Sequence, residues 1–309
     1  MKASFALLLS SVLASVNAAT YSLSDTVVPS SFLSFFEFEA IADPTHGRVN
    51  YVDQSTAESQ GLVQQASSTS FIIRADHTTV LNPSGPGRNS VRIKSQKTYT
   101  THVAVTWPAI WETNEAQWPN GGEIDIVEGV NDQTPNAATL HTGAGCTMPS
   151  ARTQTGTSTS LDCNAADNGN TGCGVQFTGV SNSYGPPFNA NGGGWYAVER
   201  SSAGINIFFW PRNSGSVPSE VKNGASTVNP DNWGTPAANF PNTNCDINSH
   251  FDEHNILINL TFCGDWAGAV YGNSGCPSTC VGDVDLNLIF DSRSHELLGR
   301  LCEQQPQCI

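Results

Sequence analysis

Glu123-Ile124-Asp125-Ile126-Val127-Glu128 places three carboxylates in an otherwise apolar, strand-like run that follows Trp118-Pro119-Asn120-Gly121-Gly122. Because side chains alternate between the two faces of a strand, Glu123 and Asp125 share one face, and Ile124 and Ile126 share the other. A regular strand would then put Val127, and not Glu128, on the face of the acids. A β-bulge absorbs one extra residue, so the pattern predicts a bulge that returns Glu128 to that face.

The predicted bulge also sets the spacing of the two glutamates. With a rise of ~3.3 Å per residue, their Cα atoms would lie roughly 14 Å apart. Side chains leaning inward would bring the carboxyls to about 5–6 Å, near the ~5–5.5 Å separation of a retaining glycosidase. The alternative is an edge strand with solvated acids. Aromatic neighbours and the β-branched residues of the opposite face argue against it.

This pattern resembles the glutamate–aspartate–glutamate signature of glycoside hydrolase family 16 in its bulged, laminarinase-type form. Further stretches are similar to family positions and occur in the family's order. They are Asp43-Pro44-Thr45-His46-Gly47, Ser90-Val91-Arg92, Trp107-Pro108-Ala109-Ile110-Trp111, Thr139-Leu140-His141-Thr142 and Gly264-Asp265-Trp266. The resemblance covers residues 24–280 and is closest to the secreted fungal β-1,3-glucanases.

The resemblance implies roles for four residues. Glu123 would be the nucleophile and Glu128 the acid/base. Asp125 would hold a proton or a hydrogen bond with Glu123 and tune its ionisation. We expect negative neighbours and aromatic surface to raise the pKa of Glu128. His141 would help to set the hydrogen bonding of Glu128. Without the motif order, a structural role is the commoner one for such a histidine.

The resemblance also implies sugar contacts from Trp111, Trp118 and Trp266 through their rings, and from Arg92 and Asn50 through polar groups. A tryptophan is equally well a core residue, so each ring alone leaves both interpretations open. The family works without a cofactor, and we expect no metal. His250, Glu253 and His254 match no metal-ligand spacing, and we interpret them as solvated polar residues.

Composition narrows the class of partner. The chain of 309 residues has 13 Lys and Arg against 27 Asp and Glu, a net charge of −14. So acidic a protein is a poor candidate for nucleic acid or for an anionic membrane surface, whereas a neutral β-glucan polysaccharide is compatible. We expect a monomer.

The first 18 residues have the pattern of a secretory signal peptide. Lys2 is followed by an apolar run over 5–16 and by small residues up to Ala18, where we expect cleavage. The alternative, a buried N-terminal helix, is less favoured. The run is too short to span a bilayer. These features predict a secreted, extracellular protein.

Nine cysteines in a secreted chain predict disulfides, and the odd number leaves at least one thiol over. For Cys276 and Cys280, a disulfide loop is favoured over a metal clip, because no second matching pair exists. The remaining pairings stay open.

Short strand-like stretches separated by turn residues predict an all-β chain. We place strands at 32–39, 71–74, 90–94, 98–105, 123–127, 195–200, 205–210 and 255–261, and a long stapled surface loop at 154–194. One β-sandwich accounts for residues 19–280 as a single catalytic domain. The resemblance sharpens this to a jelly roll (concanavalin-like) of two curved antiparallel sheets with a concave substrate cleft. Asn259-Leu260-Thr261 is a glycosylation sequon that could point outward.

The chain departs from the family pattern in two places. Before Trp107 about one strand's worth of residues is absent, which would leave a sheet edge exposed and one cysteine without its partner. The tail, 281–309, reads as helix-like and then Gln-rich. We interpret both departures as gene-model errors, which sequencing of the transcript would test.

The sequence therefore predicts a secreted endo-β-glucanase that hydrolyses β-1,3 or mixed β-1,3/1,4-glucans with retention. A transglycosylase that excludes water is an alternative of the same class. A catalytically impaired glucan-binding protein on the same fold is an alternative of another class, which the presence of all three acids disfavours.

Overall fold

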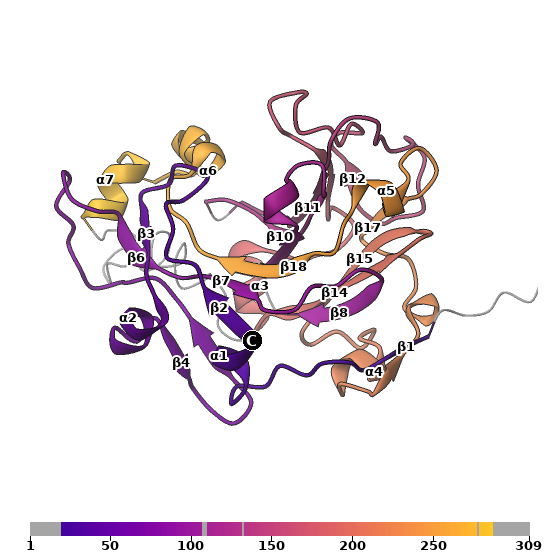
Figure 1. Cartoon of the computed structure of the whole chain (residues 1–309), viewed down its shortest axis with the longest axis horizontal. Helices are drawn as coiled ribbons and strands as arrows, with labels where there is room; N and C mark the ends of the chain where they lie inside the picture. Colours follow the sequence, from indigo (N-terminus) through magenta and orange to yellow (C-terminus); the bar gives the residue numbers. More distant parts are fainter. Residues whose placement is uncertain (1–19, 107–109, 132, 277, 287–309) are drawn as a thin grey trace, which may run out of the picture.

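The computed structural model describes residues 20–106, 110–131, 133–276 and 278–286. Over this part the fold is the predicted jelly roll, with a larger and a smaller antiparallel sheet packed face to face (Figure 1). The larger sheet has eight strands in the order β12 (Thr157–Ser158), β13 (Cys173–Gln176), β11 (Ala137–His141), β10 (Glu123–Glu128), β9 (Ile110–Thr113), β18 (Asn255–Asn259), β7 (Arg92–Ser95), β2 (Phe36–Phe38).

The smaller sheet has four strands. Its order is β17 (Ala238–Pro241), β15 (Gly204–Pro211), β14 (Gly194–Ser201), β8 (His102–Thr106). Three two-stranded pairs complete the strands: β1 (Tyr21–Ser22) with β16 (Thr227–Val228), β3 (Val49–Tyr51) with β6 (Arg88–Ser90), and β4 (Val63–Gln65) with β5 (Phe71–Ile73).

The helices of the described residues are all short. They are α1 (Phe32–Phe35), α2 (Gln54–Ser59), α3 (Gly185–Ala190), α4 (Ser219–Lys222), α5 (Ile247–His250), α6 (Asp265–Ala269) and α7 (Cys280–Asp285), with 3-10 turns η1 (Glu115–Gln117), η2 (Pro230–Asn232) and η3 (Tyr271–Asn273). None of the helices over these residues is long and apolar enough to cross a membrane.

The core fills the space between the two sheets. Ile124, Ile126 and Leu140 of the larger sheet are fully buried in one cluster with Val198 and Ile207 of the smaller sheet. The alternation of β10 therefore does what its sequence predicts: the isoleucines enter the core and the acids take the opposite face. We call that opposite face of the larger sheet the acid face.

Two of the predicted strands and the predicted loop need correction. Residues 32–35 form helix α1, whose Phe32 is buried in the core, and the strand is limited to residues 36–38. Strand β8 begins only at His102. The stretch 154–194 is more than a surface loop, since it supplies β13, which pairs with β11 in the larger sheet, and helix α3.

Three disulfides join described residues: Cys146–Cys245, Cys163–Cys173 and Cys263–Cys280. The predicted Cys276–Cys280 loop is thus wrong, because Cys280 pairs with Cys263 across a separation of 17 residues. Among the described residues Cys276 is the free cysteine.

The two departures from the family pattern fall partly within the described residues. Strand β8 is the edge of the smaller sheet, and Val105 on it is exposed; the junction at 107–109 lies outside the described residues. Beyond the predicted domain boundary at 280, α7 still packs on the body, with Val284 buried against Leu260 and Phe262. The predicted signal peptide and the tail from 287 also lie outside the described residues.

Candidate active site

Strand β10 carries the predicted bulge. In its pairing with β11, Asp125 lies opposite Thr139, but Glu128 lies opposite Ala137, so β10 has one residue more than its partner between these two positions. The extra residue returns Glu128 to the acid face. All three carboxylates predicted from the sequence therefore emerge from one strand onto one face.

Asn136 holds the bulge in place and was missed by the sequence analysis. Its side-chain oxygen accepts from the backbone N–H of Glu128 at 3.1 Å, and its amide group donates to the carbonyl of Ile126 at 3.1 Å. Both groups would lack a strand partner at the bulge. Asn136 is fully buried, so these contacts are shielded from water. Nothing in its local sequence, between Pro135 and Ala137, reveals this role.

Each glutamate has a hydrogen-bond donor from a neighbouring element. The indole N–H of Trp118 donates to Glu123 Oε2. Thr139 Oγ1 donates to Glu128 Oε2 at 2.8 Å. Thr139 belongs to the Thr-Leu-His-Thr stretch singled out in the sequence, but alternation alone did not point to it as the partner of Glu128.

Asp125 and Glu128 hold their protons more tightly than exposed carboxyls would. Burial, followed by the charges of Glu123 and Glu128, raises the pKa of Asp125 well above its usual range. Burial also raises the pKa of Glu128, while the Thr139 hydroxyl and the charge of His141 oppose the rise. The expected direction for Glu128 is confirmed, but burial is its largest cause, and the negative charge of Glu123 comes last.

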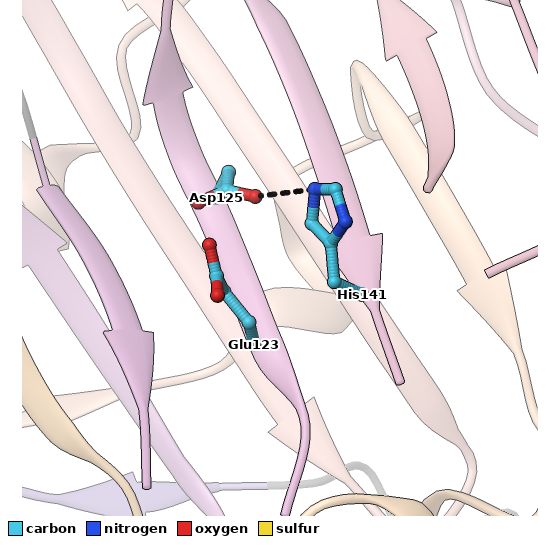
Figure 2. A group of neighbouring side chains, drawn as sticks. All are labelled: Glu123, Asp125 and His141. Atoms are coloured by element: carbon cyan, nitrogen blue, oxygen red, sulfur yellow. Dashed lines mark ion pairs between the residues drawn. The ribbon is translucent and has the colours of Figure 1, made fainter. Parts of the chain in front are cut away.

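His141 contacts Asp125, and not Glu128 as the resemblance implied. Figure 2 shows Asp125 and Glu123 on one strand and His141 on the next, with His141 Nε2 and Asp125 Oδ2 3.4 Å apart. The other ring nitrogen, Nδ1, lies 2.8 Å from Asn170 Oδ1. His141 is buried and influences Glu128 only through its charge.

Side chains of neighbouring segments hold the turn before β10 in place. The hydroxyl of Thr113 donates to the carbonyl of Gly122 at 2.7 Å, and His254 Nε2 contacts the carbonyl of Gly121 at 2.7 Å. Gly122 has φ 80°, and a Cβ there would meet the ring of Phe251 at 2.5 Å. His254 was expected in solvent but is buried, and burial lowers its pKa to about 4, so its ring is neutral.

Two exposed tryptophans lie toward opposite ends of β10. Trp118 is 43% exposed and bonds Glu123 at the start of the strand. Trp266 is 47% exposed on α6, whose Ala267 carbonyl accepts from Asn131 beyond the end of the strand. Exposed indole rings of this size are costly in water and suit the apolar faces of sugars.

Trp111 and Arg92 form one unit beside the acids. Trp111 lies opposite Asp125 in the pairing of β9 with β10. The guanidinium of Arg92 sits 5.0 Å from the centre of the Trp111 ring and is bound by the carboxylates of Glu39 and Glu115. Arg92 is 3% exposed, so the structure places it as a support for Trp111.

Asn259 of the sequon, which alternation could point outward, belongs to this unit too. Its side-chain oxygen accepts from the Trp111 indole at 2.8 Å, and its Nδ2, where a glycan would attach, donates to the hydroxyl of Tyr51 at 2.9 Å. Asn50, in contrast, lies next to Tyr51 on the opposite face of β3 and donates to Asn89. The structure does not bring Asn50 to the acids.

The outer face of this β-sandwich carries two glutamates with a third acid between them. Paired carboxyl groups are typical of the active site of a glycoside hydrolase. The comparisons define the class further. Residues 36–288 match the family model described as the XgeA-like catalytic GH16 domain. The chain belongs to glycoside hydrolase family 16.

Curated relatives support the same family. A probable endo-1,3(4)-beta-glucanase of Aspergillus clavatus is 43% identical over 84% of this chain, and a probable glycosidase of Schizosaccharomyces pombe is 41% identical over 86%. The match covers 41% of the first protein and 65% of the second, so the chain spans only part of the length of these relatives.

Solved structures agree with the fold. GH16 laminarinase 16A from Phanerochaete chrysosporium, solved with β-glucans in donor and acceptor sites, is 58% identical with a TM-score of 0.86. An elongating family 16 β-1,3-glucosyltransferase is 36% identical with a TM-score of 0.80. In each case the match covers 92% of this chain and 96% of the other.

Proposed function

We propose that this chain is a secreted endo-β-glucanase that hydrolyses β-1,3 or mixed β-1,3/1,4-glucans with retention. The observation that carries the proposal is the bulge of β10, which brings Glu123, Asp125 and Glu128 to one face. The names of the Aspergillus clavatus relative and of the Phanerochaete laminarinase support the substrate class.

In the first step a carboxylate oxygen of Glu123 attacks the anomeric carbon while Glu128 gives its proton to the leaving glycosidic oxygen. The raised pKa of Glu128 supports its role as the acid, because the group still holds its proton in mildly acidic solution. In the second step Glu128 takes a proton from water, whose oxygen displaces Glu123 from the sugar. The substrate's configuration is thereby retained.

Asp125 assists Glu123 in this scheme. It is buried, hydrogen bonded to Glu123 and neutral over a wide pH range because its pKa is raised. A neutral carboxyl beside the nucleophile donates a hydrogen bond and avoids a second negative charge. The indole of Trp118 supplies another donor to Glu123. Together they orient the attacking oxygen.

Reducing-sugar release from laminarin, lichenan and cellulose tests the activity. We expect hydrolysis of laminarin by the wild-type protein and at least a 10³-fold loss of rate in Glu123→Gln, since the nucleophile is removed. Glu58→Gln, which removes an exposed carboxyl on α2, is the matched control and should retain full activity. Activity of Glu123→Gln within tenfold of wild type would refute the assignment.

Azide separates the two glutamates. In Glu128→Ala, azide should attack the glycosyl-enzyme and give a β-glycosyl azide, because two inversions have occurred. In Glu123→Ala it should attack the substrate directly and give the α product. The opposite pattern of anomers, read by NMR, would exchange the two roles.

Transglycosylation is the second candidate, favoured by the likeness to an elongating β-1,3-glucosyltransferase. Mass spectrometry of products at high laminarioligosaccharide concentration distinguishes the two. Products longer than the substrate would show transfer, and shorter products alone would show hydrolysis. A glucan-binding protein without catalysis would bind laminarin and give neither.

Secretion and a monomeric state complete the proposal. Three disulfides among the described residues suit an oxidising compartment. N-terminal sequencing of protein from culture medium should begin at Ala19. Sedimentation should give a single species of monomer mass.

A further inference from the structure

Three side chains of the acid face could act together as ligands of a metal ion. One donor atom each from Glu123, Asp125 and His141 lies within 4.8 Å of the others, and no other such group of three is found over the described residues. Figure 2 shows the three side chains converging from two adjacent strands. Two carboxylates and an imidazole form a donor set that zinc and copper accept.

A buried oxygen in this cluster lacks a donor. Asp125 is only 6% exposed, and its Oδ2 has no hydrogen-bond partner among the described residues. His141 Nε2 lies 3.4 Å from this oxygen and is its ion-pair partner only when the ring is charged. A buried carboxyl oxygen without a hydrogen-bond partner is costly. A cation between it and the imidazole would remove that cost, and its binding would release the Asp125 proton to solvent.

Asn170 orients the imidazole as a ligand. Its side-chain oxygen lies 2.8 Å from His141 Nδ1 and can only accept, so Nδ1 is the donor. In the neutral ring the lone pair is then on Nε2, the nitrogen that faces Asp125. Metal-binding histidines in proteins are commonly held by such an acceptor on the second ring nitrogen. The Cys163–Cys173 disulfide closes the loop that carries Asn170.

We propose that the face formed by Glu123, Asp125 and His141 binds one zinc or copper(II) ion, which excludes glucan. Bond lengths of about 2.0–2.2 Å set tetrahedral ligands about 3.4 Å apart, so the partly exposed Glu123 side chain closes on the ion by about 1 Å. A water molecule takes the fourth position. Calcium is a poorer fit, because it requires six to eight oxygen ligands.

The effect on catalysis rests on the proposed function, whereas the binding does not. An ion coordinated by Glu123 removes the nucleophile, so zinc should inhibit laminarin hydrolysis competitively, and a chelator should restore the rate. Metal binding without any glucanase activity would leave the site standing and refute the proposed function. Activity unaffected by saturating zinc would refute the inhibitory site.

Binding is measured on the whole secreted protein by zinc calorimetry and by the EPR spectrum of added copper(II), which reports a nitrogen ligand. We expect one ion per chain and at least tenfold weaker binding in His141→Gln. His46→Gln is the matched control, because His46 also faces an aspartate, Asp265, but is exposed and lies in a loop outside the three-residue cluster. Equal losses in both variants would assign the ion to surface histidines.

Asn170 offers a test that does not touch a ligand. Asn170 is exposed and has φ 60°, which glycine adopts readily, so Asn170→Gly removes the acceptor without disturbing the fold. Binding should weaken tenfold to a hundredfold. Asn170→Asp should tighten it, because a carboxylate is the stronger acceptor. Identical affinities in wild type and both variants would overturn the proposal.

Discussion

Asp125 shows how a single residue trades stability for chemistry. Its folded pKa lies well above the unfolded value, near 3.8, so the folded state holds a proton that the unfolded state loses as the pH rises past 4. Stability therefore falls with rising pH on account of this group. This destabilising contribution to the free energy of unfolding is zero in strong acid and grows as the pH rises toward 7.

Asp125→Asn should remove this decrease of stability with rising pH. An amide has the same shape and no charge to lose, so we expect the variant to be more stable than wild type at pH 7 by at least about 1 kcal/mol, since one unit of pKa difference is worth about 1.4 kcal/mol. The gain should vanish near pH 3.5. Urea unfolding at both pH values measures it, and a gain of equal size at both would contradict the account.

Asn136 is the second residue whose contacts carry a prediction. Asn136→Ala leaves the N–H of Glu128 and the carbonyl of Ile126 without their side-chain partner inside the protein. We expect a loss of about 2–4 kcal/mol in the free energy of unfolding. Glu128 should also shift, lowering kcat more than it raises KM. Asn136→Asp keeps the acceptor and should lose less of kcat; equal losses in the two would argue for a purely structural role.

At the scale of elements, the acid face is assembled from strands distant in sequence. Trp111 on β9 is held by Arg92 on β7 and Asn259 on β18. Arg92→Lys keeps the positive charge for Glu39 and Glu115 but loses the planar group that stacks on the indole. We expect KM for laminarin to rise about threefold to tenfold with kcat nearly unchanged. An unchanged KM in a folded variant would remove Trp111 from the sugar-binding surface.

The sequence predicted the elements that are determined by neighbouring residues, and it missed those that are determined by contacts between distant strands. Strand β10 and its bulge were readable, because alternation and the extra residue lie within six consecutive positions. Strand β13 was not, because Gly-rich sequence around it resembles a loop and its place is set by pairing with β11. Asn136, Thr139 and Asn259 act through contacts with other strands, which no local pattern records.

At the scale of the whole molecule, the charge of −14 governs which polysaccharides approach. A neutral glucan is neither attracted nor repelled by the net charge of the protein. We therefore expect kcat/KM on laminarin to change less than twofold between 20 and 300 mM NaCl. A carboxymethylated β-1,3-glucan should be hydrolysed slowly at low salt and faster as salt screens the repulsion. Strong salt dependence with the neutral substrate would show that charge contributes to binding it.

The position of β18 has a consequence for biosynthesis. This strand, from near the end of the described chain, separates β9 from β7 in the larger sheet. Until residues 255–259 have left the ribosome, the nascent chain contains β7 and β9 but lacks β18, the strand that pairs with both. The sheet therefore closes only after residues 255–259 have been synthesised, and until then the facing edges of β9 and β7 stay unpaired and prone to aggregation.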